Sequence, residues 1–113
     1  MLPRAHRLVK QKDFQLLAQK GKPFYSPLFT LKVFKSAREA SQFGIVISAK
    51  VSKKAVVRNK IKRRMTEIIK KMPASLAKNK KVMILVKPVA ATKDYPVIKE
   101  ELERLFNKAG LLS

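Results

Sequence analysis

A helical stripe between two strand-like runs restricts the fold more than any other feature of this sequence. Residues 54–72 carry apolar side chains at helical spacing, namely Val57, Ile61, Met65, Ile68 and Met72. Apolar, β-branched runs over 43–51 and 82–86 flank this helix, and Pro73 ends it. A strand, a crossover helix and a second strand predict two parallel neighbours in one sheet. We interpret 43–51 as a central strand and 82–86 as a strand buried on both faces.

The rest of the chain supplies two more helices and two more strands. Apolar spacing predicts a first helix over 12–20, ended by Gly21 in a left-handed cap. Alternation within 24–34 predicts a half-buried strand, with a short strand before Pro27. A last helix begins near Asp94 and ends at Gly110. The predicted class is α+β, a two-layer αβββαβα sandwich with helices packed on a mixed sheet.

The size and charge of the chain indicate one folded domain with a polyanionic partner. No repeat or linker interrupts the 113 residues, so we treat 1–113 as a single domain. A hydrophobic content of 46% is enough for a modest core. The formal charge of +20 comes from 27 Lys and Arg against 7 Asp and Glu, and nucleic acid is the obvious partner for such a chain. No apolar run approaches the roughly 18 residues that span a bilayer, so we expect no membrane-spanning segment.

Several enzyme classes are disfavoured by the residues that the chain lacks. It has no cysteine and a single histidine, His6, which we expect to be exposed, so disulfides, thiolate nucleophiles and a metal cluster built on them are excluded. The basic first twelve residues lack an apolar region, which argues against a secretory signal and for the cytoplasm. Most acidic residues fall in the last helix, where helix electrostatics explain them. We therefore expect no catalytic residue and no metal site in the protein itself.

The most informative stretch is a basic run without an acidic residue. Its members are Lys50, Lys53, Lys54, Arg58, Lys60, Lys62, Arg63 and Arg64. A merely solvated helix face would interleave Glu with Lys at four-residue spacing, whereas basic side chains alone form a phosphate-binding ridge. Arg58, Asn59 and Arg63 add planar forks and an amide, which suit folded RNA. DNA is a less favoured partner because no second helix lies a short turn away.

The segment Ala55-Val56-Val57-Arg58-Asn59-Lys60-Ile61-Lys62-Arg63 resembles the signature helix of the bacterial ribonuclease P protein, A-V-x-R-N-R-x-K-R. Its flanks also follow in the right order, namely Leu2-Pro3-Arg4, Arg7-Leu8, Asp13-Phe14, Gly21 and Gly44-Ile45-Val46-Ile47-Ser48. The resemblance covers essentially the whole chain. It implies the αβββαβα sandwich with a left-handed crossover, which is an exception to the right-handed rule.

The resemblance also implies a function, that of the non-catalytic protein subunit of an endonuclease that removes the 5′ leader of precursor tRNA. The RNA subunit would perform the hydrolysis with Mg²⁺ that it mainly holds itself. The protein would contact this ribonuclease P RNA through Lys53, Lys54, Arg58, Asn59, Lys60, Lys62 and Arg63. A cleft between the first helix and the sheet would bind the single-stranded leader, with Phe14, Lys32 and Lys50 as its candidate contacts. Phe14 fits a role as a core residue equally well.

Four positions depart from the family pattern. Lys60 keeps the charge of the usual arginine but loses its fork, and Ser52 stands near a frequent glycine. Ala18 replaces a frequent aromatic of the cleft, which predicts weaker stacking on the leader, and Thr66 replaces a frequent arginine. A basic structural protein of the ribosome remains the alternative, because size, charge and composition fit it equally well. Only the Arg58-Asn59 motif and its flanks separate the two.

Overall fold

The computed structural model describes residues 7–8, 10–36, 41–72 and 78–111. His6 and Pro73 lie outside these ranges. The elements in chain order are α1 (Gln11–Lys20), β1 (Lys22–Tyr25), β2 (Phe29–Lys35), β3 (Gln42–Val46), α2 (Ala55–Lys70), β4 (Lys80–Val86), the 3₁₀ helix η2 (Pro88–Thr92) and α3 (Tyr95–Lys108). The predicted αβββαβα order is confirmed, with η2 as an addition that the apolar pattern did not predict.

The four strands form one mixed sheet in the order β1-β2-β4-β3. β2 pairs antiparallel with β1 and with β4, whereas β3 runs parallel to β4. The predicted parallel pair joined by a crossover helix is therefore confirmed, with α2 as the crossover. The prediction that 43–51 is a central strand is wrong, because β3 lies at the edge of the sheet and ends at Val46. Beyond it, a turn is closed by the Val51 amide, which donates to the Ser48 carbonyl at 3.0 Å.

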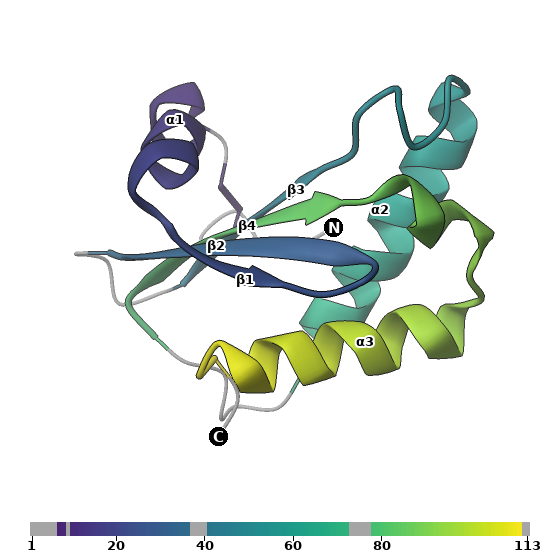
Figure 1. Ribbon diagram of the computed structural model, residues 1–113. Helices are drawn as coiled ribbons and strands as arrows, with labels where there is room; N and C mark the ends of the chain where they lie inside the picture. The colour runs from purple at the N-terminus through teal and green to yellow at the C-terminus, as the bar shows by residue number, and fades with distance from the viewer. Residues whose placement is uncertain (1–6, 9, 37–40, 73–77, 112–113) are drawn as a thin grey trace.

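The main core fills the space between one face of the sheet and the helices α2 and α3 (Figure 1). The apolar stripe of α2 is buried as predicted, with Ile61, Met65 and Ile68 all below 6% exposed. The rings of Phe43 on β3 and Phe106 on α3 stack with centroids 6.0 Å apart. The sequence of β3 is apolar because other parts of the protein cover both faces of this strand. Its composition therefore does not reveal that β3 is an edge strand, with a full-length partner strand on one side only.

A smaller cluster holds α1 on the opposite face of the sheet (Figure 1). Its buried members are Leu8, Leu17 and Met83, and the partly buried Phe14, Phe34, Val46 and Leu85 pack against them. Val82 and Ile84 of β4 belong to the main core while Met83 belongs to this cluster, so the predicted burial of β4 on both faces is confirmed. The Asp13 carboxylate of α1 accepts from Lys81 Nζ at 2.8 Å, which adds an ion pair between this helix and β4.

The two glycines predicted to end helices act differently. Gly110 ends α3, as predicted, and its φ of +75° lies in the left-handed region. Gly21 has a φ of −65°, so the predicted left-handed cap is wrong. A Cβ at Gly21 would lie 2.5 Å from the Leu17 carbonyl oxygen and 2.9 Å from Lys32 Cβ. A glycine is needed here because α1 passes close to β2, and not for its freedom in φ.

Both edges of the sheet carry features that limit further strand pairing. On β1, Pro23 pairs with Lys32 and has no amide hydrogen to offer to another strand. Beside β3, Arg7 forms a parallel bridge with Phe43, and the Leu8 amide donates to the Phe43 carbonyl at 2.9 Å. The N-terminal segment thus occupies part of the edge that β3 would otherwise expose.

Candidate nucleic-acid interface

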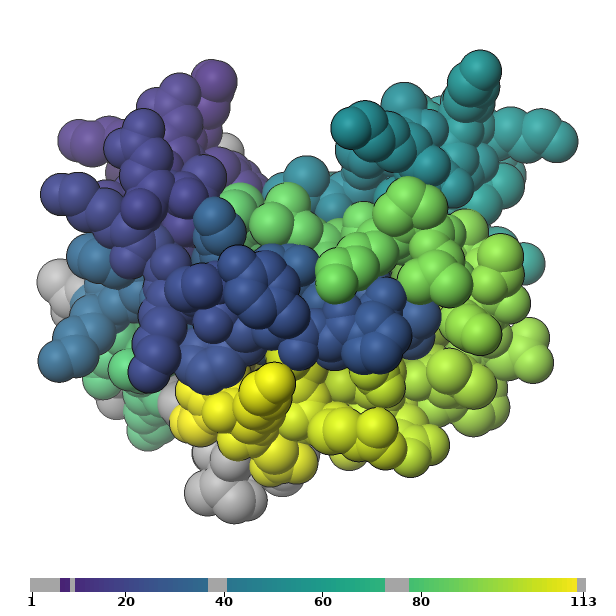
Figure 2. Space-filling view, in the orientation of Figure 1, coloured from purple at the N-terminus to yellow at the C-terminus, as the bar shows by residue number. Residues whose placement is uncertain are grey.

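A cleft of about 700 Å³ lies between α1, the edge strand β3 and α2. Figure 2 shows the surface hollowed between α1 and the N-terminal part of α2. The residues that line the cleft are Arg7, Leu8, Phe14, Phe43, Gly44, Ile45, Asn59, Lys62, Arg63, Thr66 and Glu67. Its floor is therefore apolar, and one wall carries the cations of α2. A hollow of this composition suits an extended chain of phosphates and bases.

Phe14 reaches the floor of the cleft because β3 has a glycine beneath it. A Cβ at Gly44 would lie 2.5 Å from Phe14 Cε1 and 2.6 Å from Phe14 Cζ, so the ring rests directly on the strand backbone. The half-buried Phe14 side chain also packs against the cluster around Leu17 and Met83. The two roles considered for this residue are thus combined, since the ring supports α1 and lines the cleft.

The signature segment places its polar groups on different sides of α2. Asn59, Lys62 and Arg63 line the cleft, whereas Lys60 lies outside it. Arg58 does not reach the cleft either, because its Nη1 donates to the Ser52 carbonyl at 2.7 Å and ties the start of α2 to the preceding loop. This contact makes Arg58 a residue that shapes the N-terminal end of the helix.

The N-terminal end of α2 is unusually positive. Lys53 and Lys54 are exposed just before the helix, and the first turn contains no acidic residue. The Lys54 side chain makes no capping hydrogen bond, and its amide donates to Ser52 Oγ at 3.2 Å. Cations at this end oppose the helix dipole, which stabilises anions there. A phosphate at the start of α2 would offset this repulsion.

Two predicted leader contacts lie outside the cleft lining. Lys32 is on the face of β2 turned toward α1, but its Nζ donates to the Ala18 carbonyl at 2.8 Å. It therefore binds the carbonyl end of α1, where a cation is favourable. Lys50 is exposed in the turn after β3. The structure thus brings Phe14 together with Asn59 and the α2 cations, but brings neither of these lysines to them.

Seven cleft residues were not predicted from the sequence as functional, namely Arg7, Leu8, Phe43, Gly44, Ile45, Thr66 and Glu67. Arg7 Nε is buried and has no hydrogen-bond partner among the described residues. Thr66 is buried, and its Oγ1 donates to the Lys62 carbonyl at 2.8 Å, so it offers the cleft little polar surface. Gly44 did carry a signal, since a glycine within a strand often marks a close approach. The others become neighbours only through the tertiary fold.

Two further kinds of site were sought among the described residues, a metal-ligand cluster and a membrane-spanning helix. Within 7–8, 10–36, 41–72 and 78–111, no group of three His, Cys, Asp or Glu side chains is placed to hold a metal ion. No helix in this part of the chain is long and apolar enough to cross a membrane.

The comparisons with known proteins identify the family. The ribonuclease P family model matches residues 2–110. The ribonuclease P protein component of Microcystis aeruginosa is 36% identical, with 98% of this chain and 96% of that protein covered. The one from Dictyoglomus turgidum is 38% identical, with 97% and 93% covered.

Solved structures agree with this assignment. The ribonuclease P protein of Staphylococcus aureus has a TM-score of 0.90 at 26% identity, covering 97% of this chain and 100% of that one. The protein from Thermotoga maritima has a TM-score of 0.82 at 26% identity, covering 90% and 96%. The resemblance of the signature helix is confirmed, and the ribosomal alternative loses its support. The chain belongs to the ribonuclease P protein family.

Proposed function

We propose that this chain binds ribonuclease P RNA through α2 and the 5′ leader of precursor tRNA in the cleft between α1 and α2. In this role it assists the RNA-catalysed removal of the leader in the cytoplasm. The observation that carries the proposal is the cleft itself, in which Phe14 and Asn59 share one hollow with Lys62 and Arg63.

The electrostatics of α2 support a role in RNA binding. The ion pairs in which both partners are described join Lys81 to Asp13 and Arg104 to Glu100 and Glu101. The cations of α2 form no ion pair with a described residue, so their charge is available to a partner. Lys and Arg side chains that neutralise phosphates release condensed counterions, and this release makes the binding strong and dependent on salt.

The donor groups of the cleft do not fit a metal ion held by the protein. Glu67 is the single carboxylate among its lining residues, which also include the cations Lys62 and Arg63. Mg²⁺ binds through several hard oxygen ligands, usually with phosphates among them. We therefore assign Mg²⁺ to the RNA subunit, where it supplies the chemistry of hydrolysis, and we assign no catalytic residue to the protein.

The cleft gives the protein a way to select precursor over mature tRNA. The leader is the part of the precursor that the mature product lacks. The single-stranded leader would stack on the Phe14 ring, with its phosphates near Lys62 and Arg63. These contacts add binding energy for the precursor that is lost once the leader is removed. The assembled enzyme should then bind substrate more tightly than product, which favours release after cleavage.

Cleavage of precursor tRNA by the cognate RNA at low Mg²⁺ tests the role of α2. Wild-type protein should stimulate cleavage by the RNA, and the protein without the RNA should give no cleavage. The double variant Arg58→Ala/Asn59→Ala should lose most of the stimulation. Lys99→Ala/Asn107→Ala is the matched control, because it removes one cation and one asparagine from exposed positions of α3. Cleavage by the protein alone would contradict the assignment of the chemistry to RNA.

Binding of tRNA with and without its leader tests the cleft separately. Phe14→Leu keeps an apolar side chain in the cluster around Leu17 but removes the ring. It should narrow the difference in affinity between precursor and mature tRNA, while affinity for the RNA subunit stays unchanged. Equal affinity of the wild-type holoenzyme for both tRNAs would refute leader binding.

A further inference from the structure

A second hollow lies on the other side of α2, against the start of α3. This groove has a volume of about 490 Å³ and is lined by Lys60, Arg63, Arg64, Glu67, Lys71 and Tyr95. The members on α2 recur at steps of three and four residues, which places them along one face of the helix. Arg63 and Glu67 also line the cleft. They therefore form the ridge that separates the two hollows.

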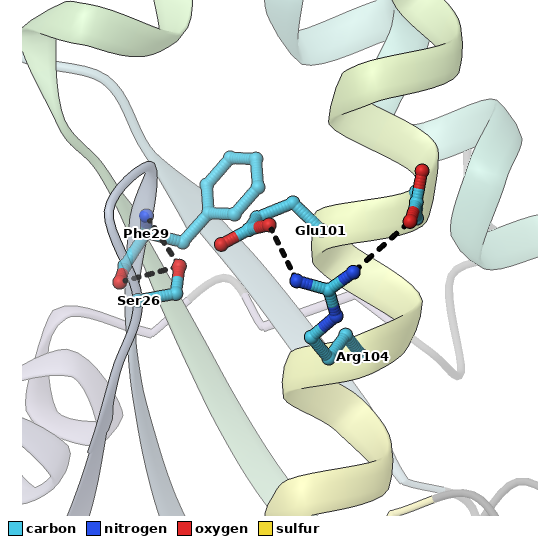
Figure 3. Close-up of polar contacts among 5 residues, drawn as sticks. Ser26, Phe29, Glu101 and Arg104 are labelled. Atoms are coloured by element: carbon cyan, nitrogen blue, oxygen red, sulfur yellow. Dashed lines mark hydrogen bonds and ion pairs between the residues drawn. The ribbon is translucent and has the colours of Figure 1, made fainter.

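The cations of this groove are available to an outside anion. The contrast is on α3, where Figure 3 shows Arg104 paired with Glu101. Arg104 Nη1 lies 3.7 Å from Glu101 Oε2, and Arg104 Nη2 lies 3.0 Å from Glu100 Oε1. Lys60, Arg64 and Lys71 form no ion pair with any described residue. Even Glu67, three residues after Arg64 and four before Lys71, stays more than 4.0 Å from their charged nitrogens.

Tyr95 gives the groove an aromatic wall beside these cations. It begins α3, is half-buried, and packs against the main core, which fixes the ring in place. Its hydroxyl has no hydrogen-bond partner among the described residues. A fixed aromatic ring beside several cations is the combination that binds an unpaired nucleotide, because the ring contacts the base while the cations contact adjoining phosphates.

We propose that this groove binds an unpaired nucleotide of ribonuclease P RNA, with Tyr95 against the base and Lys60, Arg64 and Lys71 at the neighbouring phosphates. The inference rests on the proposed function. The RNA subunit is the favoured occupant because the groove faces α3, on the side of α2 away from the cleft assigned to the leader. The RNA subunit would then contact both sides of α2.

Two adjacent lysines at the C-terminal end of α2, its last residue Lys70 and the following Lys71, provide the first test. Lys71 lines the groove, whereas Lys70, also exposed and one residue earlier, lines neither hollow. Lys71→Ala should weaken binding of the RNA subunit about fivefold and lower the slope of log affinity against log salt by about 0.7 to 0.9, the value for one lost phosphate contact. Lys70→Ala should change affinity less than twofold. Equal effects would mean that only general attraction acts here.

The two tyrosines of the chain provide the second test. Tyr95→Phe keeps the ring and should bind the RNA subunit within twofold of wild type, whereas Tyr95→Leu should bind at least about fivefold more weakly, as expected for a lost base stack. Tyr25→Leu is the control, because Tyr25 is 61% exposed on β1 and outside the groove. Denaturant unfolding of each variant verifies that all are folded under the binding conditions.

The outcomes separate this inference from the proposed function. If wild-type protein binds and stimulates the RNA but Lys71→Ala and Tyr95→Leu match their controls, the groove is no RNA site and the proposed function stands. If the wild-type protein itself neither binds nor stimulates the RNA, the proposed function is wrong and this inference falls with it.

Discussion

Gly44→Ala should push Phe14 out of its place in the cleft. The new Cβ would lie 2.5 Å and 2.6 Å from two ring carbons, while carbon atoms in contact prefer about 3.5 to 4.0 Å. The ring must therefore retreat by about 1 Å. Overpacking of this kind typically costs about 1 to 3 kcal/mol, against a gain of about 0.5 to 1 kcal/mol for replacing a strand glycine by alanine. These ranges leave a net loss of about 0 to 2.5 kcal/mol in the free energy of unfolding, and we expect a value near the middle, about 1 kcal/mol.

The same change in a Phe14→Ala background isolates the clash. Without the ring, the nearest remaining contact of the new Cβ is Leu8 Cδ2 at 3.1 Å, which a small shift can relieve. Urea unfolding of the four proteins should then give an interaction energy of about 1 kcal/mol between the two sites. Holoenzyme affinity for precursor tRNA should fall in Gly44→Ala while affinity for the RNA subunit is retained. An equal loss of stability with and without Phe14 would refute the argument.

Three further changes test separate parts of the structure. Gly110→Ala should lower stability by about 1 kcal/mol through the positive φ alone, because among the described residues the new Cβ meets no atom within 4 Å apart from its own chain neighbours. A neutral result by thermal unfolding would contradict this. Arg58→Lys should lose the bond to the Ser52 carbonyl, with faster hydrogen exchange at the first turn of α2 and about 1 kcal/mol less stability; unchanged exchange would show that Arg58 does not order this turn. Asp13→Asn should speed exchange in α1 but not in the sheet, because the pair with Lys81 joins that helix to β4; uniform change across the protein would argue against a separately held α1.

Much of the fold follows from periodic residues. The stripe from Val57 to Met72 predicts α2 because one buried side at helical spacing leaves few alternatives. The order of strand, helix and strand predicts the parallel pair for similar reasons. The place of β3 in the sheet was missed, because a strand covered on both faces has the same composition at an edge as in the middle. Gly21 was misread because close packing and positive φ both select glycine.

The site was predicted less completely than the fold. A single helix carries Asn59, Lys62 and Arg63, so their association needed only local spacing. The alternation of apolar and polar residues correctly placed Lys32 on the face of β2 that is turned toward α1. Which part of α1 Lys32 contacts depends on how the helix packs on the sheet, and this was not predicted. Arg7 and Glu67 line the cleft from segments far apart in the chain, and no local sequence pattern predicts that they lie in the same cleft.

The protected edges of the sheet affect how readily this protein aggregates at high concentration. Free molecules with a charge of +20 repel one another, and this repulsion disfavours aggregation at low salt. Bound RNA or concentrated salt removes that long-range protection. Pro23 on β1 and the bond from the Leu8 amide to Phe43 on β3 are independent of charge. They continue to oppose edge-to-edge β aggregation when ribonucleoprotein particles crowd together with their charges neutralised.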